Sequence, residues 1–326
     1  MRSAQRRATF IITVAAILVV AAAMFLWIRS KPAPEPGAFR VGYQTSMLYL
    51  PVFVAQERGY FAERGLHAEL VRFGSANEMA QALATDRIEA TGMSSLTVLA
   101  NLERNSPGTF RIYLLEVLTA DLSPDALVVP SSSDIRTLAD LRGKRLGLHP
   151  GTTLRNYAAN FLRAAVGQDH GVTFVPLPPE IQLQSLASGS IDALYSLEPI
   201  PTVAETEIGA RIVARGLLAR HIHDPFFAGA GVIATSAVES RPEAVAAYRA
   251  AIREALQYIA SNEMDARALM TNYASVSPET ARKMSLVGWI EPRSASLPHW
   301  RATIQALVNM GEMPAEVELE RTFLGN

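Results

Sequence analysis

The chain has 326 residues, 49% hydrophobic and 19% charged, which is enough for two folded domains with their own cores. It has no cysteine, which excludes disulfides, thiolate metal sites, a cysteine nucleophile and a lipidated N-terminal cysteine. Its 30 basic and 31 acidic residues give a net charge of −1.

The first 31 residues predict a membrane anchor or a signal segment. Arg2, Arg6 and Arg7 precede an uncharged run over residues 8–28. As a helix this run would span roughly 31 Å, about the thickness of a bilayer core. The basic residues favour an N-terminus in the cytoplasm and the remainder outside. Two alternatives stay open, an uncleaved inner-membrane anchor and a signal peptide cleaved at alanines 21–23.

Residues 32–37 are rich in proline and predict a short, semi-rigid spacer. Five of the 30 basic residues precede position 32, so residues 32–326 carry 25 basic against 31 acidic residues, a net charge of −6. An acidic body has no electrostatic basis for binding nucleic acid, and we expect no nucleic-acid partner.

From residue 38 the chain alternates short apolar runs with helical segments, which is typical of parallel sheets with helical crossovers. In a first series we expect strands at 39–44, 67–73, 88–93 and 110–118, and helices at 51–58, 76–84 and 96–104. In a second series we expect strands at 126–130, 145–149, 172–177, 191–196 and 211–214, and helices at 138–141, 153–166 and 181–187.

The last hundred residues have a different pattern. One strand is expected at 229–234, and every element after it is expected to be helical. Ser240 and Glu243 fit a capping box around Pro242 at the start of a long helix. The apolar stripes of these helices indicate core packing.

Three sequence blocks occur twice, in the same order. Residues 40–43 (Arg-Val-Gly-Tyr) resemble residues 145–148 (Arg-Leu-Gly-Leu), at an offset of 105. The blocks that begin near residues 70 and 83 recur at offsets of 104 and 103. Such a repeat predicts two similar α/β lobes, and two facing lobes imply a cleft that can hold a ligand.

The incomplete repeat predicts how the chain is divided. Lobe I comprises residues 38–124 and the returning helical tail 226–326, whereas lobe II comprises residues 125–225. The chain then crosses twice between the lobes, an arrangement that permits closure about a hinge.

Candidate ligand contacts lie in loops that follow predicted strands, because ligands collect at the carboxyl ends of parallel strands and helix N-termini attract anions. Ser94-Ser95 and the segment 151–153 are the best matched pair, although serine and threonine are also ordinary helix caps. Arg155 could bind an anionic group or be a solvated surface residue. Glu198 could meet a substrate amine or cap a turn. The full set of candidate ligand-binding residues is Ser46, Tyr49, Gly74, Ser75, Ser94, Ser95, Gly151, Thr152, Thr153, Arg155, Glu198 and Phe226.

The sequence offers little for catalysis. His149 follows a strand and could act as a base, but a lone histidine there is more typical of a structural hydrogen bond. His221 and His223 have the wrong spacing for a helical zinc pair. Neither a Gly-x-Ser-x-Gly elbow nor a Walker-type loop occurs. We therefore expect a binding protein without catalytic residues, metal or cofactor.

Residues 40–287 resemble extracytoplasmic solute-binding proteins of ABC importers, in the nitrate/sulfonate/taurine branch, which is related to thiamine-pyrimidine precursor-binding proteins. The resemblance rests on residues 51–61 followed by Gly65-Leu66, on residues 138–144, and on Gly189-Ser190-Ile191-Asp192-Ala193 with Glu198-Pro199. The chain departs from this pattern at Asp86-Arg87, where the family has a glycine-containing turn, and in its apparent anchor.

The resemblance implies a two-lobed periplasmic-binding-protein fold of type II. It implies that the protein binds a small anionic or zwitterionic solute (a sulfonate, taurine or a nitrate-like ion) between the lobes and delivers it to ABC permease and ATPase subunits. The expected location is periplasmic, tethered to the inner membrane through residues 8–28. Alternatives are a pyrimidine-precursor binding or synthesis protein of the same fold, and a membrane-tethered periplasmic sensor.

Overall fold

The structure is a computed structural model that describes residues 37–151 and 153–325. Contacts join Phe39–Asn326 into one compact unit. The predicted anchor over residues 8–28, and all but the last residue of the predicted spacer, lie outside the described residues. Among the helices that are described, none is long and apolar enough to cross a membrane.

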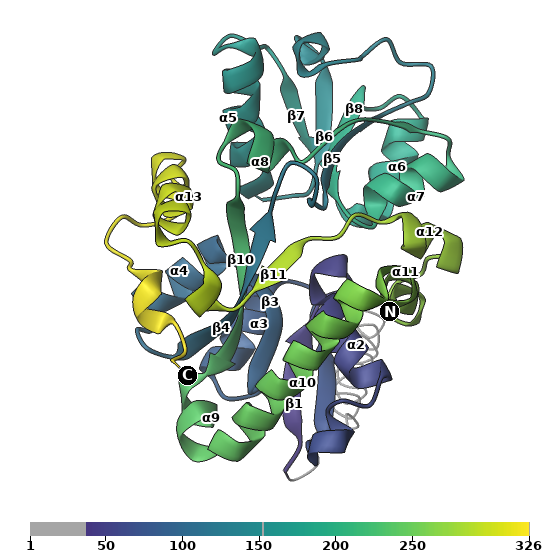
Figure 1. Cartoon of the computed structure of the whole chain (residues 1–326). Helices are drawn as coiled ribbons and strands as arrows, with labels where there is room; N and C mark the ends of the chain where they lie inside the picture. The colour runs from purple at the N-terminus through teal and green to yellow at the C-terminus, as the bar shows by residue number, and fades with distance from the viewer. Residues whose placement is uncertain (1–36, 152, 326) are drawn as a thin grey trace, which may run out of the picture. The chain divides into compact units, whose positions relative to one another are not determined.

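Lobe I is built on a six-stranded sheet with the strand order β11-β4-β10-β3-β1-β2 (Figure 1). Strand β1 is parallel to β2 and β3, whereas β10 runs antiparallel to β3 and β4. The strands are β1 (Phe39–Tyr43), β2 (Ala68–Arg72), β3 (Ala90–Ser95), β4 (Phe110–Leu118), β10 (Phe226–Ala234) and β11 (Gly288–Ile290). Its helices are η1 (Met47–Tyr49), α2 (Leu50–Glu57), η2 (Ala62–Arg64), α3 (Ala76–Ala84), α4 (Leu96–Asn105), α9 (Thr235–Ser240), α10 (Pro242–Ser261), α11 (Glu263–Ala268), η4 (Leu269–Asn272), α12 (Pro278–Lys283), η5 (Pro292–Ser294), α13 (Leu297–Asn309) and η6 (Leu319–Thr322).

Lobe II is built on a five-stranded sheet with the strand order β7-β6-β8-β5-β9. Strand β6 is parallel to β7 and β8, and β5 is antiparallel to β8 and β9. The strands are β5 (Asp125–Val129), β6 (Arg145–Leu148), β7 (Thr173–Pro176), β8 (Ala193–Leu197) and β9 (Arg211–Arg215). Its helices are η3 (Leu138–Leu141), α5 (Thr153–Val166), α6 (Pro179–Ala187), α7 (Ile200–Glu207) and α8 (Leu217–His221).

The chain passes twice between the two sheets. It leaves the first sheet after β4, enters the second at β5, and returns from α8 to β10 (Figure 1). Both sheets thus consist of a parallel βαβ core and an inserted antiparallel strand, as expected for two similar α/β lobes. The lobe boundaries at residues 124/125 and 225/226 stay predictions.

The repeated arginine and acidic residue make the same contacts in both sheets. Arg40 on β1 donates from its backbone nitrogen (2.7 Å) and its guanidinium (2.8 Å) to the Glu89 carboxylate. Arg145 on β6 does the same with Asp192, at 2.7 and 2.8 Å. The motif therefore joins the first strand of each repeat to the turn before the third strand, which fixes the parallel register between them.

The repeated glycine provides space for a repeated isoleucine. A methyl group on Gly42 would lie 2.7 Å from Cδ1 of Ile88, and one on Gly147 would lie 2.5 Å from Cδ1 of Ile191. Both distances are too short for real carbon atoms, so any larger residue would displace the isoleucine from the core. The repeat in the sequence therefore corresponds to the same side-chain packing in both sheets.

The departure at Asp86-Arg87 preserves the local conformation. Asp86 has φ +55° and Gly189, its counterpart in the second repeat, has φ +72°. Their carbonyl oxygens accept from the equivalent arginines, Arg40 at 2.9 Å and Arg145 at 2.7 Å. Aspartate tolerates the left-handed region better than most residues, so the turn keeps its shape without glycine.

Two expectations for the tail were wrong. The tail contains a strand, β11, which pairs antiparallel with β4 and was missed because three residues are too few for a periodic signal. Ser240 does not cap the long helix. It ends α9, and its hydroxyl donates to the carbonyl of Ser236 (2.6 Å), while Arg241 precedes α10 without a side-chain cap.

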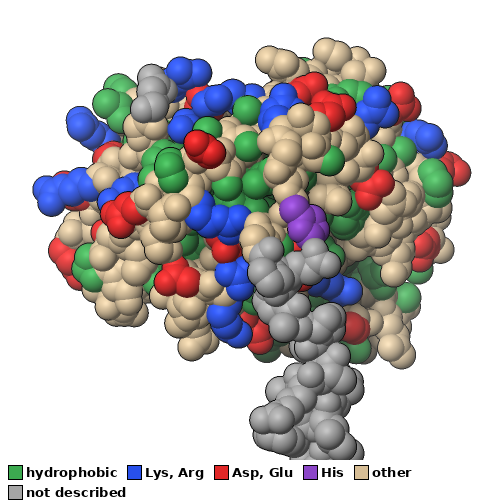
Figure 2. Space-filling view, turned by 90° about the horizontal axis from the view of Figure 1, so that it is seen from below, with side chains coloured by type: hydrophobic (Ala, Val, Ile, Leu, Met, Phe, Trp, Pro, Cys, Tyr) green, Lys and Arg blue, Asp and Glu red, His purple; other side chains and the backbone are tan. Residues whose placement is uncertain are grey.

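Acidic and basic side chains are mixed on one face of the molecule. Figure 2 shows one face, where Lys and Arg alternate with Asp and Glu outside the area covered by grey atoms. A protein that binds nucleic acid through its backbone phosphates concentrates its basic residues on one surface. This face has no such concentration.

Candidate functional site

Three of the candidate serines in lobe I cap helices at the ends of strands. Ser46 accepts from the Leu48 amide (3.4 Å) before η1, and Ser75 accepts from the Glu78 amide (3.2 Å) before α3. Ser95 accepts from the Val98 amide (3.3 Å) before α4. Nearby, the carbonyl of Gly74 accepts from the side-chain amide of Gln44 (3.3 Å). Each serine therefore already has a structural role in this structure, and contact with a ligand stays a prediction.

Ser94 differs from these three serines. It ends β3, it is 3% exposed, and its hydroxyl has no hydrogen-bond partner among the described residues. Tyr49 lies beside it, buried, with its hydroxyl donating to the carbonyl of Met93 (3.0 Å). A buried hydroxyl without a partner is costly unless something else supplies the hydrogen bond. Ser94 is therefore the candidate serine whose hydroxyl no described residue uses, and its contact with a ligand stays a prediction.

Glu116 lies close to Ser94 and was not among the candidate residues. It belongs to β4 opposite Gly229 of β10, and its side chain is buried, with 3% exposed. A methyl group on Gly229 would lie 2.6 Å from Oε2 of Glu116 and 2.7 Å from the backbone oxygen of Ser94. The glycine thus leaves room for the carboxylate to lie across β10 beside the end of β3.

The Glu116 carboxylate is held in an apolar environment. Burial raises its pKa to about 8, and no hydrogen bond or cation among the described residues offsets that effect. The Glu116 charge affects the pKa values of two tyrosines. Burial is the largest cause that raises the pKa of Tyr49, and the Glu116 charge is the second. Burial, Glu312 and Glu116 together raise the pKa of Tyr157. Tyr49 belongs to lobe I and Tyr157 to lobe II, so Glu116 lies where the lobes meet.

Helix α5 supplies the lobe II side of this region. Tyr157 on α5 is buried and its ring packs edge-on against Phe226 of β10, with 5.8 Å between ring centroids. Phe226 is fully buried at the point where the chain re-enters lobe I. This aromatic contact holds the first turns of α5 against lobe I.

The start of α5 is also tied to the C-terminal tail. Glu312, which is 5% exposed, accepts from the Thr153 hydroxyl (2.8 Å) and from the side-chain amide of Asn156. A carboxylate suits the N-terminus of a helix, where amides are free and the dipole is positive. An anionic ligand at this helix terminus would have to share or displace that carboxylate. Thr152 lies outside the described residues, and Gly151 is exposed with φ +115°.

We expect Glu312→Ala to destabilise the protein by about 1–3 kcal/mol, because two partly buried donors at the start of α5 lose their shared, buried acceptor. Urea unfolding measures the change. Glu316→Ala, an exposed residue of the same segment, is the matched control. Equal stability of the two variants would show that the tail contact does not hold α5.

Neither Arg155 nor Glu198 contacts Ser94 in the described part of the chain. Arg155 is exposed, and its guanidinium lies 5.9 Å from the centroid of the Phe174 ring on β7. Glu198 is 2% exposed and accepts from Arg215 (2.6 Å), from the Thr202 hydroxyl (2.8 Å) and from the Ser285 amide (3.2 Å). Of the two alternatives for Glu198, these bonds match the structural one, because they cap α7 and tie it to the tail.

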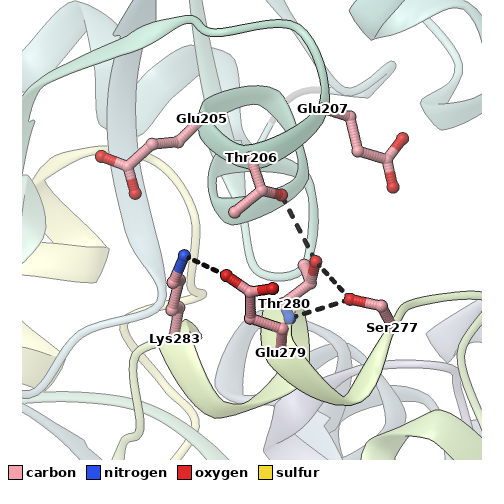
Figure 3. A pocket seen from close by; sticks show the side chains of 7 residues that line it. All are labelled: Glu205, Thr206, Glu207, Ser277, Glu279, Thr280 and Lys283. Atoms are coloured by element: carbon pink, nitrogen blue, oxygen red, sulfur yellow. Dashed lines mark hydrogen bonds and ion pairs between the residues drawn. The ribbon is translucent and has the colours of Figure 1, made fainter.

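A separate pocket of about 590 Å³ lies between α7 and α12 (Figure 3). Its polar groups are engaged with one another, Thr280 with Ser277 (2.9 Å) and Thr206 (3.4 Å), and Lys283 with Glu279 (2.9 Å). The remaining lining side chains are the exposed carboxylates of Glu205 and Glu207. Because these polar groups already bond to one another, the pocket has fewer unpaired hydrogen-bonding groups for a solute than the region around Glu116.

The histidines make local contacts. His149 is exposed, and Nδ1 of its ring lies 2.8 Å from the carbonyl oxygen of Pro150. His223 contacts His299, with 3.2 Å between their ring nitrogens. In residues 37–151 and 153–325, no group of three or more His, Asp or Glu side chains is placed to hold a metal ion.

Two α/β lobes joined by two chain passages, with buried polar groups where they meet, define the periplasmic-binding-protein fold, and comparison with known proteins agrees. The family model described as NMT1/THI5 like matches residues 47–266, and the chain belongs to that family. A Bacillus subtilis (strain 168) protein named for binding aliphatic sulfonates is 24% identical over 212 residues. That match spans 63% of this chain and 60% of the relative.

Solved structures show the same fold. The periplasmic aliphatic sulphonate binding protein SsuA from Escherichia coli has a TM-score of 0.71 at 16% identity, over 89% of this chain and 93% of that one. The alkanesulfonate-binding protein SsuA from Xanthomonas axonopodis pv. citri, bound to MOPS, has a TM-score of 0.68 at 18% identity, over 90% and 99% of the two chains.

Proposed function

We propose that this protein is the extracytoplasmic solute-binding component of an ABC importer. It binds a small anionic or zwitterionic solute of the sulfonate class between its lobes and passes it to the permease. The observation that supports this most is that two buried polar groups, Glu116 of lobe I and Tyr157 of lobe II, interact beside the end of the parallel strand β3. Ligands of open α/β sheets collect at that position.

Family membership and the names of the relatives support the class of solute. Binding requires no chemical step, so we propose no catalytic residues. The tether through residues 8–28 and the periplasmic location belong to the same proposal. An anchored receptor would be held close to its permease, which raises their effective concentration.

The two passages between the lobes support closure about a hinge. Tyr157 of α5 and Phe226 of β10 are both buried and pack against each other, so movement of α5 away from lobe I would expose this contact to a solute. A solute that contacts both lobes stabilises the closed form by its differential affinity for it.

We expect a bound solute to raise the melting temperature, since only the folded protein binds it. We also expect X-ray scattering to report a smaller radius of gyration. The panel comprises alkyl sulfonates, taurine, nitrate, carboxylates and aminopyrimidines. If no member changes the melting temperature at millimolar concentration, the proposal is wrong.

A further inference from the structure

The described part of the chain buries four carboxylates, and three of them have donors. Asp125 accepts from the Leu217 amide (2.8 Å), and its other acceptor contacts are to Ser123, Leu218 and Tyr195. Glu198 accepts from Arg215, and Glu312 accepts from Thr153. Glu116 is the fourth, and no described residue donates to it.

The surroundings of Glu116 leave it without protein partners. Its Oε2 lies over Gly229, next to the backbone oxygen of Ser94, which is another acceptor. The hydroxyl of Tyr49 is already committed to the carbonyl of Met93. The Ser94 hydroxyl does not complete this cluster, because Ser94 pairs with Ala230 whereas Glu116 pairs with Gly229, which places the two side chains on opposite faces of the sheet.

An uncompensated buried carboxylate costs stability, and such groups are typical of functional sites. A mutation to glutamine or an apolar residue would relieve the cost without changing the fold. In its ionised form this carboxylate would repel a sulfonate or nitrate placed against it. A nitrogen that donates hydrogen would be attracted, and most strongly if it is positively charged.

We propose that Glu116 is the receptor for an amine nitrogen of the solute. This rests on the proposed function and narrows it: the solute has an amine at the lobe I side, so a zwitterionic aminosulfonate fits better than a simple anion. An aminopyrimidine would also donate an N–H hydrogen bond to Glu116. The experiment below distinguishes an aminosulfonate from an aminopyrimidine.

Isothermal titration of the full-length chain with two matched pairs of probes tests this. Taurine and ethanesulfonate differ only in the amine, as do 4-aminopyrimidine and pyrimidine. We expect the wild type to bind one amine at least about 10-fold more tightly than its amine-free partner, the usual effect of a charge-assisted hydrogen bond. The pair of probes in which the amine binds more tightly identifies the class of solute, an aminosulfonate or an aminopyrimidine.

In Glu116→Gln the preference is expected to fall to about 3-fold or less, because glutamine cannot neutralise an ammonium. Glu69→Gln, an exposed residue of β2, keeps the wild-type preference. Binding of ethanesulfonate or pyrimidine at least as tightly as its amine partner by the wild type would overturn the inference and leave the proposed function intact. So would an undiminished preference in Glu116→Gln. Failure of every probe and every panel member to bind would overturn both.

Discussion

Glu116→Gln is expected to stabilise the ligand-free protein, by about 3 kcal/mol at pH 7 and at most about 5 kcal/mol above pH 8. The folded-state pKa of Glu116 is raised from 4.5 to about 8. Between these values the native state holds a proton that the unfolded state releases, so stability falls as pH rises. Above pH 8 the Glu116 carboxylate is ionised in the native state, and the full free-energy cost of burying its charge lowers the stability. Glutamine removes that cost at every pH.

The measurement is urea unfolding of both proteins at pH 5, 7 and 9 without added solute. The gap between them should be small at pH 5 and grow with pH. The groups that face Glu116 are Tyr49 and Tyr157, whose own pKa values are raised far above this range, so they do not titrate within it. Glu69→Gln is the exposed control. A variant that is less stable than wild type, or a gap independent of pH, would show that the carboxylate is compensated after all.

Arg215→Met is expected to destabilise the protein by about 3 kcal/mol, because removing one partner of a buried ion pair leaves the other charge unpaired. Nη1 of Arg215 lies 2.6 Å from Oε1 of Glu198, whose side chain is fully buried. The amide of Ser285 and the Thr202 hydroxyl would remain, and they do not carry a compensating charge. The loss should appear as a lower urea midpoint with an unchanged slope.

The double variant Glu198→Gln/Arg215→Met should recover part of that loss, since the unpaired charge is gone. Arg321→Met is the matched control. Arg321 also pairs with an acidic residue, Glu318 (2.7 Å), but on the surface, where such pairs contribute about 0–1 kcal/mol. A single variant as stable as Arg321→Met, with no recovery in the double variant, would exclude a structural role for the pair.

The repeat in the sequence predicted much of the fold. Residues 40–43 and 145–148 look alike because each contains an arginine that pairs with an acidic residue and a glycine that admits an isoleucine. Three adjacent parallel strands require these residues at the same positions in each sheet. The repeated residues are therefore separated by a nearly constant number of residues along the chain. Helices α3 and α5 and strand β4 begin and end at the predicted residues.

The candidate site was less predictable, for physical reasons. Strand-end serines are used both as caps and as ligand contacts, and the sequence cannot separate Ser94 from Ser95. Glu312 is more than 150 residues from Thr153, and no local pattern links them. Glu116 did leave a signal, an acidic residue inside the mostly apolar strand Phe110–Leu118, but the search followed strand ends and not strand interiors.

The most direct measurement is a crystal structure of the protein with the amine that binds most tightly in the probe series. The account predicts the solute between the lobes, with its nitrogen about 2.7–3.2 Å from a carboxylate oxygen of Glu116. A solute bound instead in the pocket between α7 and α12, or one whose anionic group faces Glu116, would contradict it.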